Sequence, residues 1–233
     1  MSRNEYLLGV RHGVPVGLGY LSVSFGFGAL AATHGISAFE AAVISFANLT
    51  SAGQFAGLTL ILASAGLWEM VLTQMVINSR YALMSLALSQ RMGRSIGLLP
   101  RFLLAFFNTD EIFALAMARK EPLTTAYFLG LATLPMLGWT AGTVLGALAG
   151  AALPKNLQAA LGVMLYGMFV AIVVPPAKKE RAVLICALLA LALSSLFAWL
   201  PILSGISAGI SIVICTVAAA AVCSYLFPLK EEA

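Results

Sequence analysis

The chain has 233 residues, of which 61% are hydrophobic and only 9% are charged. Soluble domains carry roughly 25% charged residues, so this composition excludes a soluble globular protein. The formal net charge of +4 therefore concerns membrane topology, because Lys and Arg concentrate in cytoplasmic loops. A spanning helix needs about 20 mostly apolar residues. The chain is predicted to be an all-α polytopic membrane protein with about seven or eight membrane segments.

Eight apolar segments follow one another, and together they predict a single transmembrane domain over residues 1–233. Their approximate ranges are 13–33, 38–65, 67–89, 102–118, 123–153, 157–174, 182–200 and 206–227. The sixth segment is expected to end at Pro175-Pro176, because proline interrupts helical hydrogen bonding. Pro15 matches Pro135 and Gly26 matches Gly146 at an offset of 120 positions. These two matches leave open an internal repeat with halves 11–118 and 123–228.

Two of the segments are expected to be broken or re-entrant. Residues 48–54 (Asn-Leu-Thr-Ser-Ala-Gly-Gln) are mostly poor helix formers, and Gly53 is free to adopt the backbone angles of a break. This run predicts two half-helices that meet near mid-membrane. Unwound backbone at that depth is tolerated only where it is buried in protein or lines a cavity. The fourth segment, at ~25 Å, is slightly short of a ~30 Å core and is either a short span or a re-entrant helix.

Basic residues pose a conflict about topology. Two basic loops are predicted to be cytoplasmic, together with Arg3 and Arg11. They contain Arg91, Arg94 and Arg101, and Lys178, Lys179 and Arg181. Counting one crossing per segment places the first of these loops outside. The conflict disappears if the second segment enters and leaves on one face, and a weak charge bias on the wrong side would also explain it.

Three charges lie inside apolar segments, namely Arg80, Asp110 and Glu111. Each costs at least ~2.5–3.5 kcal/mol at membrane depth, so such residues face inward and usually serve function. Two interpretations stay open: a structural ion pair between two helices, and a substrate or proton site.

Polar residues extend this cluster. Gln74, Asn78, Tyr81 and Ser85 form one stripe at helical spacing, suited to interhelical hydrogen bonding or to lining a cavity. If the helix breaks at Ser51–Gln54, its free N–H groups and positive dipole end form a site for a carboxylate. The alternative is a kink that serves packing alone.

The sequence contains none of the common short motifs of catalytic sites. It contains no H-E-x-x-H, G-x-S-x-G or phosphate-binding Gly motif. Cys186, Cys215 and Cys223 are predicted to be buried, inert thiols, and His12 and His34 lie too far apart along one helix to share a metal. We therefore expect no enzymatic activity, no cofactor and no metal site.

The chain resembles the AzlC family, the large subunit of branched-chain amino-acid exporters, over roughly residues 11–227. The resemblance is carried by five short motifs, at residues 13–17 (GVPVG), 51–55 (SAGQF), 78–85 (NSRYALMS), 109–111 (TDE) and 127–130 (YFLG). It implies a secondary transporter that exports leucine, isoleucine and valine across the bacterial inner membrane, with methionine as a further candidate. It also implies a small AzlD-type membrane subunit as partner. Gly138, Gly142, Gly146 and Gly150 form a close-packing ladder that is a candidate surface for this partner or serves packing within the chain.

Chemistry and resemblance together predict one substrate-binding site. The N–H groups of residues 51–54 would hold the substrate carboxylate, and Asp110 or Glu111 with Asn78 would hold its ammonium. The full predicted set is Asn48, Ser51, Gly53, Gln54, Asn78, Arg80, Tyr81, Asp110 and Glu111. The alternatives are a membrane-embedded binding subunit of a multi-component importer, and an intramembrane enzyme. The adjacency of Asp110 and Glu111 argues against the enzyme, because neighbouring helical residues point about 100° apart.

Overall fold

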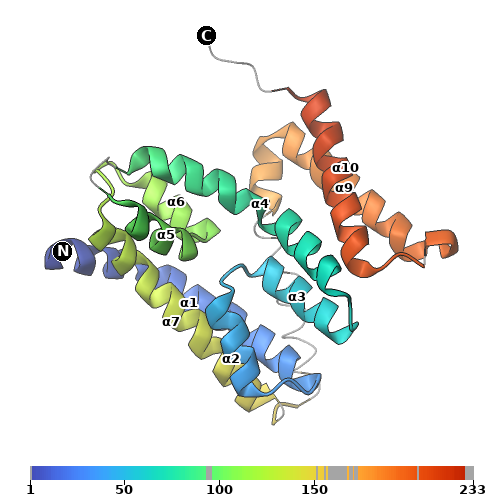
Figure 1. Ribbon diagram of the computed structural model, residues 1–233, viewed down its shortest axis with the longest axis horizontal. Helices are drawn as coiled ribbons and strands as arrows, with labels where there is room; N and C mark the ends of the chain where they lie inside the picture. Colours follow the sequence, from blue (N-terminus) through green and yellow to red (C-terminus); the bar gives the residue numbers. More distant parts are fainter. Residues whose placement is uncertain are drawn as a thin grey trace. The chain divides into compact units, whose positions relative to one another are not determined.

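The described residues of the computed structural model are helices joined by short turns, with no strand among them. They comprise residues 2–92, 96–150, 152–154, 156, 167, 170, 173–203 and 205–228. The helices labelled in Figure 1 are α1 (Arg3–Thr33), α2 (Ala38–Ala47), α3 (Ala52–Leu62), α4 (Leu67–Arg91), α5 (Leu98–Phe106), α6 (Asp110–Ala118), α7 (Thr125–Gly150), α9 (Arg181–Trp199) and α10 (Ala208–Leu226). A 3₁₀ turn covers Pro201–Leu203.

The prediction of an all-α membrane protein is confirmed. Four of the described helices, α1, α7, α9 and α10, are long and apolar enough to cross a membrane. The predicted segments 67–89, 182–200 and 206–227 match α4, α9 and α10 closely, whereas α1 begins ten residues earlier than predicted. Most of the sixth segment lies outside the described residues.

The predicted end of the sixth segment at Pro175-Pro176 is wrong, because residues 173–179 are helical throughout. The φ angle of proline is compatible with a helix, and apolar helices in membranes tolerate the hydrogen bond that proline removes.

The predicted break in the second segment is confirmed. Helix α2 ends at Ala47 and α3 begins at Ala52. The left-handed residue is Ser51, with φ +50°, whereas Gly53 lies in the first turn of α3. The expectation for Gly53 was therefore wrong. A single left-handed non-glycine residue costs on the order of 1–3 kcal/mol and persists where its surroundings fix it.

The fourth segment contains a second break. It forms two short helices, α5 and α6, separated by residues 107–109, and not one continuous helix. The side chain of Thr109 caps α6 by accepting the N–H of Ile112 at 3.4 Å. Asp110 and Glu111 follow in the first turn, where acidic groups interact favourably with the helix dipole. The polar motif therefore starts a helix.

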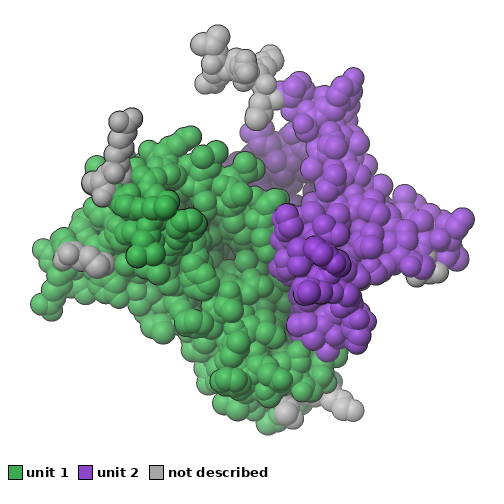
Figure 2. Space-filling model, viewed as in Figure 1, with its two compact units in different colours: residues 1–54, 78–165 green, residues 55–77, 166–233 purple. Residues whose placement is uncertain are grey.

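The chain divides into two compact units, which Figure 2 colours green and purple. Unit 1 comprises residues 1–54 and 78–165, and unit 2 comprises residues 55–77 and 166–233. In unit 2, α9 packs against α10, and a carboxylate oxygen of Glu69 accepts the N–H of Gly209 at 2.9 Å. The predicted halves 11–118 and 123–228 stay a prediction.

Unit 1 is built on α1 and α7, which lie side by side along their whole length (Figure 1). The ladder glycines of α7 lie against successive turns of α1, since a Cβ added to any of them would come within 3.0 Å of an α1 backbone atom. The pairs are Gly138 with Gly17, Gly142 with Leu21, Gly146 with Phe25 and Gly150 with Ala29. The residue numbers increase together, so the two helices are parallel. The ladder therefore serves packing within the chain, and its surface is covered.

The ends of several helices of unit 1 meet, at what we call the basic end. Arg119, which follows α6, forms an ion pair with Glu5 at 2.9 Å, and Arg91 at the end of α4 donates to the carbonyl of Arg119. At the other end of α6, Tyr20 of α1 lies 2.7 Å from the Thr109 hydroxyl and Arg80 of α4 lies 2.5 Å from Asp110. Residues 78–91 of α4 and all of α6 thus run antiparallel to α1, and both segments end where α1 and α7 begin.

Candidate functional site

Both breaks lie beside the middle of the α1–α7 pair, and we call this region the mid-helix site. Tyr20 and Trp139 mark it, with their rings in T-shaped contact at a centroid distance of 5.2 Å. Each residue is near the centre of its helix, since α1 has 31 residues and α7 has 26. If these two helices, which are long and apolar enough to cross a membrane, do cross it, a polar group beside their centres lies near mid-membrane.

The first break is fixed to α7 by a buried polar network. The amide nitrogen of Gln54 donates to the hydroxyl of Ser45 at 2.5 Å, and Trp139 Nε1 donates to the amide oxygen of Gln54 at 2.8 Å. The Ser45 hydroxyl also lies 2.7 Å from that of Thr143. All four side chains are buried. Gln54, a predicted substrate residue, thus uses both ends of its amide to hold the break in place.

A small cavity lies between the two breaks, and we call it the break cavity. Its volume is about 160 Å³. It is lined by residues 47–50 of the first break, residues 105, 106, 108 and 109 of the second, and Tyr81 of α4. The walls combine polar groups with the apolar side chains of Leu49 and Phe106. This combination suits a small ligand that has both polar and apolar parts.

One polar atom of Asn108, a residue that lines the cavity, has no hydrogen-bond partner. Its side-chain nitrogen donates to Ser85 at 3.3 Å, but its Oδ1 is buried and accepts no hydrogen bond from any described residue. A buried acceptor without a donor costs about 1–3 kcal/mol. By contrast, the neighbouring Asn48 accepts the hydroxyl of Thr50 at 2.5 Å. This oxygen has less than 1 Å² of accessible surface, so a bound donor reaches it only after the Asn108 side chain turns toward the cavity.

The two adjacent carboxylates have different partners. Asp110 pairs with Arg80 at 2.5 Å, and both side chains are about one third exposed, at 33% and 35%. The guanidinium of Arg80 also donates to the Tyr81 hydroxyl at 3.0 Å and lies over its ring. Glu111 instead accepts a hydrogen bond from the hydroxyl of Tyr20. Asp110 is therefore paired with a cation, whereas Glu111 accepts a hydrogen bond from a neutral hydroxyl. The two carboxylates have separate partners and do not form a carboxylate pair that shares one ligand.

The remaining predicted residues lie around this centre. Ser51 forms the left-handed turn of the first break, Gly53 is in the first turn of α3, and Asn78 lies half-buried on α4, one turn before Tyr81. Of the predicted polar stripe, Tyr81 lines the break cavity and Ser85 contacts Asn108. Gln74 belongs to unit 2.

The predicted substrate-binding set lacks several residues of the site. They are Tyr20, Ser45, Asn108, Thr109, Trp139 and Thr143. One signal was available, since Trp139 and Thr143 follow two ladder glycines directly and so lie on adjacent turns of a close-packed helix. A hydrogen-bonding side chain in such a position needs a partner, and Gln54 was a candidate for that partner.

The fold and the site define a class: a polytopic α-helical membrane protein with a polar site between two broken segments. The family model described as AzlC protein matches residues 15–153, and the chain belongs to the AzlC family. It is 30% identical to the inner membrane protein YgaZ of Escherichia coli (strain K12), over 88% of this chain and 87% of that protein. It is 31% identical to an uncharacterized membrane protein of Archaeoglobus fulgidus, over 74% and 76% of the two chains. A further uncharacterized membrane protein, from Helicobacter pylori (strain J99), is 30% identical over 60% of this chain and 61% of its own length. No solved structure matches the chain.

Proposed function

We propose that this chain is a subunit of a secondary transporter that exports branched-chain amino acids across the bacterial inner membrane. Leucine, isoleucine and valine are the proposed substrates, with methionine as a further candidate. Membership of the AzlC family supports a transport role, and the E. coli relative is named as an inner membrane protein. The proposed partner is a small AzlD-type membrane subunit. It would bind elsewhere than the Gly138–Gly150 ladder, because α1 covers that ladder.

The observation that carries the proposal is the break cavity, in whose wall the polar Asn108 lies beside the apolar side chains of Leu49 and Phe106. An amino acid brings an ammonium group, which has three donors and no acceptor, as a lysine side chain does. We assign this ammonium to Asn108 Oδ1 and to Asp110, which follows Thr109 of the same wall. The apolar side chain of the substrate would then pack against Leu49 and Phe106.

The substrate carboxylate is assigned to the opposite wall. The N-terminus of α3 carries a partial positive charge that attracts anions. In the structure the N–H of Gly53 donates to the carbonyl of Thr50 at 3.3 Å, so the carboxylate would compete with this contact or use the guanidinium of Arg80. The proposed function does not need Asp110 and Glu111 to act together, and their separate partners disfavour an acid–base enzyme.

The orientation follows from the basic end of unit 1. Arg91 and Arg119 lie there with the start of α1, so the positive-inside rule assigns this end to the cytoplasm. Helix α1 leaves this end and α4 returns to it. If each crosses once, the broken segment between them begins and ends on the outer face. The α5–α6 segment likewise begins and ends on the cytoplasmic face. The two breaks would then reach the same depth from opposite sides, and both basic loops would be cytoplasmic, as the positive-inside rule predicts.

The test is the efflux of preloaded radiolabelled leucine from cells that make this chain, with and without the small partner subunit. We expect efflux that depends on the partner and is lost in Asp110→Asn. The matched control is Glu180→Gln, which neutralises an exposed carboxylate before α9 and should keep full efflux. Wild-type efflux from Asp110→Asn would remove Asp110 from the site, and no leucine efflux with the partner present would refute the proposed substrate.

A further inference from the structure

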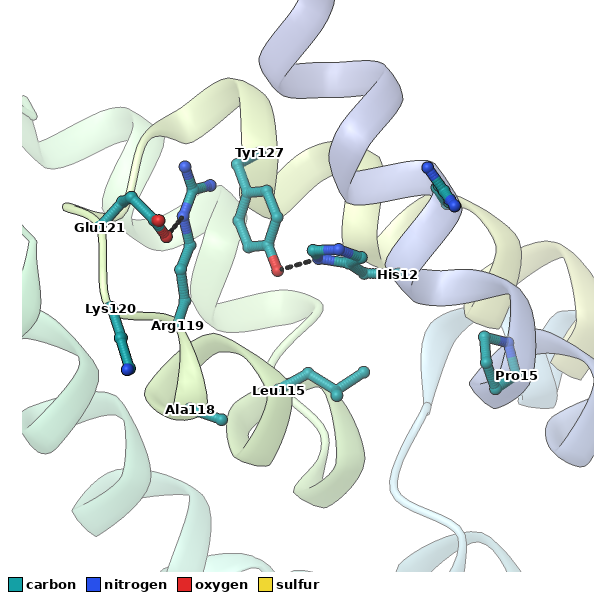
Figure 3. Close-up of a pocket in the computed structure, with 9 residues that line it drawn as sticks. His12, Pro15, Leu115, Ala118, Arg119, Lys120, Glu121 and Tyr127 are labelled. Carbon is teal, nitrogen blue, oxygen red and sulfur yellow. Dashed lines mark hydrogen bonds and ion pairs between the residues drawn. The ribbon is translucent and has the colours of Figure 1, made fainter.

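A second cavity, of about 770 Å³, lies at the basic end of unit 1, away from the break cavity. We call it the basic pocket. Figure 3 shows its wall, to which α1, α6, the connection after α6 and α7 all contribute. Its charged lining residues are Arg11, Arg119, Lys120 and Glu121, and Leu115 and Ala118 are among its apolar ones. Cations outnumber carboxylates, so the pocket favours an anion.

Arg119 and Tyr127 form one part of the pocket wall, and each makes several contacts there. The guanidinium of Arg119 lies over the ring of Tyr127, 3.9 Å from its centroid, and pairs with Glu5 at 2.9 Å. The hydroxyl of Tyr127 lies 2.9 Å from Nδ1 of His12, as Figure 3 shows. The hydrogen bond that Arg119 donates to the carboxylate of Glu5 raises the pKa of Arg119. Arg119 therefore stays charged, but its charge is largely matched by nearby carboxylates.

Arg11 and Lys120 are the cations left to a ligand. Both side chains are exposed, and no carboxylate among the described residues forms an ion pair with either. They come from different elements, α1 and the connection after α6, and both line the same cavity. Two cations that line one pocket and have no carboxylate partner among the described residues attract an anionic group, with which each can form a charge-assisted hydrogen bond.

The depth of the pocket matches the phospholipid headgroups. Helix α1 is ~46 Å long, about 16 Å more than the hydrocarbon core, so ~8 Å projects at each end if it is centred. Arg11 then lies about 4 Å inside the edge of the core, from where a long basic side chain reaches the interface. Leu115 and Ala118 belong to α6, which runs from the mid-helix site to the basic end. If α1 is centred in this way, the guanidinium of Arg11 reaches the headgroup region, and Leu115 and Ala118 lie beside the first acyl carbons.

We propose that the basic pocket binds an anionic phospholipid of the cytoplasmic leaflet. Arg11 and Lys120 hold its phosphate, and an acyl chain lies against Leu115 and Ala118. Basic pockets between membrane helices on the cytoplasmic side are suited to such headgroups. A soluble anion would leave the apolar wall unoccupied, which favours the lipid. The bound lipid connects α1 to the end of α6 and stabilises unit 1.

Purified full-length protein in detergent provides the test. Phosphatidylglycerol should raise the midpoint of thermal unfolding by about 5 °C when present at 100 times its Kd, and native mass spectrometry should detect a retained lipid. Phosphatidylcholine and glycerol 1-phosphate should do neither. The double variant Arg11→Gln, Lys120→Gln should lose the shift and retain at least tenfold less phosphatidylglycerol.

Two controls separate the pocket from general charge effects. Lys178→Gln with Lys179→Gln removes two exposed cations elsewhere and should behave as wild type, and the charge-conserving Arg11→Lys with Lys120→Arg should keep binding. An unchanged shift in the Arg11→Gln, Lys120→Gln variant would overturn the proposal. An equal shift with glycerol 1-phosphate would also refute it, because the site would then select a soluble anion. Displacement of the lipid by leucine would identify the pocket as a substrate entrance, again contradicting it.

Discussion

The hydrogen bond from Trp139 to Gln54 can be measured as a coupling energy. Both side chains are buried, the bond is 2.8 Å long, and the other end of the Gln54 amide is bound to Ser45. Trp139→Phe removes the donor and leaves a buried acceptor unpaired, which costs about 1–3 kcal/mol. Gln54→Leu leaves the indole N–H unpaired in the same way. The double variant contains neither the indole donor nor the amide acceptor. Each substitution should therefore lower the free energy of unfolding less when the other is present than when it is made alone.

The free energy of unfolding of the four proteins in the cycle gives this coupling. Double-mutant cycles for side-chain hydrogen bonds between membrane helices average ~0.6 kcal/mol and reach ~1.7. We expect a value near the upper end, because both groups are fully desolvated here. Trp199→Phe, at an indole that is 84% exposed on α9, is the matched control and should not couple to Gln54→Leu. Additivity of the Gln54 and Trp139 substitutions within about 0.3 kcal/mol would refute the network.

Three further predictions concern helix packing and the charged centre. Gly142→Ala should lower the free energy of unfolding by about 1–3 kcal/mol, since its Cβ would overlap the α1 backbone. Gly19→Ala, which has open space around it, is the control and should be neutral or stabilising. Thermal unfolding distinguishes the two variants, and equal effects would contradict the close packing of α7 on α1. Exchanging the pair as Arg80→Asp with Asp110→Arg should restore expression relative to either single charge reversal but not leucine efflux; restored efflux would show that the pair is only a structural lock. Tyr20→Phe removes the hydroxyl that donates to Glu111 and should reduce efflux without reducing the amount of protein in the membrane; unchanged efflux would exclude this contact from transport.

The first break was predictable because its signal is local. Six polar or small residues between positions 48 and 54 interrupt an otherwise apolar run, and no helix packed in lipid needs them there. The identity of the left-handed residue was not predictable from intrinsic preference, which favours Gly53. The structure uses Ser51, so the packing of the turn outweighs a local cost of on the order of 1–3 kcal/mol.

The sequence also contains a signal for the second break, but the short length of the fourth segment favoured a single helix. Thr109 followed by Asp110 and Glu111 is typical of a helix start, but the apolar residues on both sides favoured one short helix. The end of the sixth segment shows the opposite error, since Pro175-Pro176 was given too much weight as a helix terminator.

Long-range partners could not be derived from the sequence. The glycine ladder predicted that a helix would pack closely on α7, but nothing local identifies α1 as that helix or fixes its register. Likewise, Gln54 and Trp139 are far apart along the chain and meet only because α2 and α7 pack together. The charged pair was easier, because one unpaired Arg and two carboxylates within apolar segments leave few ways to neutralise the charge. The sequence alone did not show which of the two carboxylates, Asp110 or Glu111, pairs with Arg80.

The central claim is that the two breaks form one amino-acid site at mid-membrane depth. The most direct measurement is the rate at which a small thiol reagent modifies Thr50→Cys, in a background where Cys186, Cys215 and Cys223 are replaced by alanine. Thr50 lines the break cavity, and Lys120→Cys, outside it, is the control. Saturating leucine should slow modification of Thr50→Cys and leave Lys120→Cys unaffected, and Asp110→Asn should abolish the protection. Equal rates at Thr50→Cys with and without leucine, in a protein complex that still exports leucine, would contradict the claim.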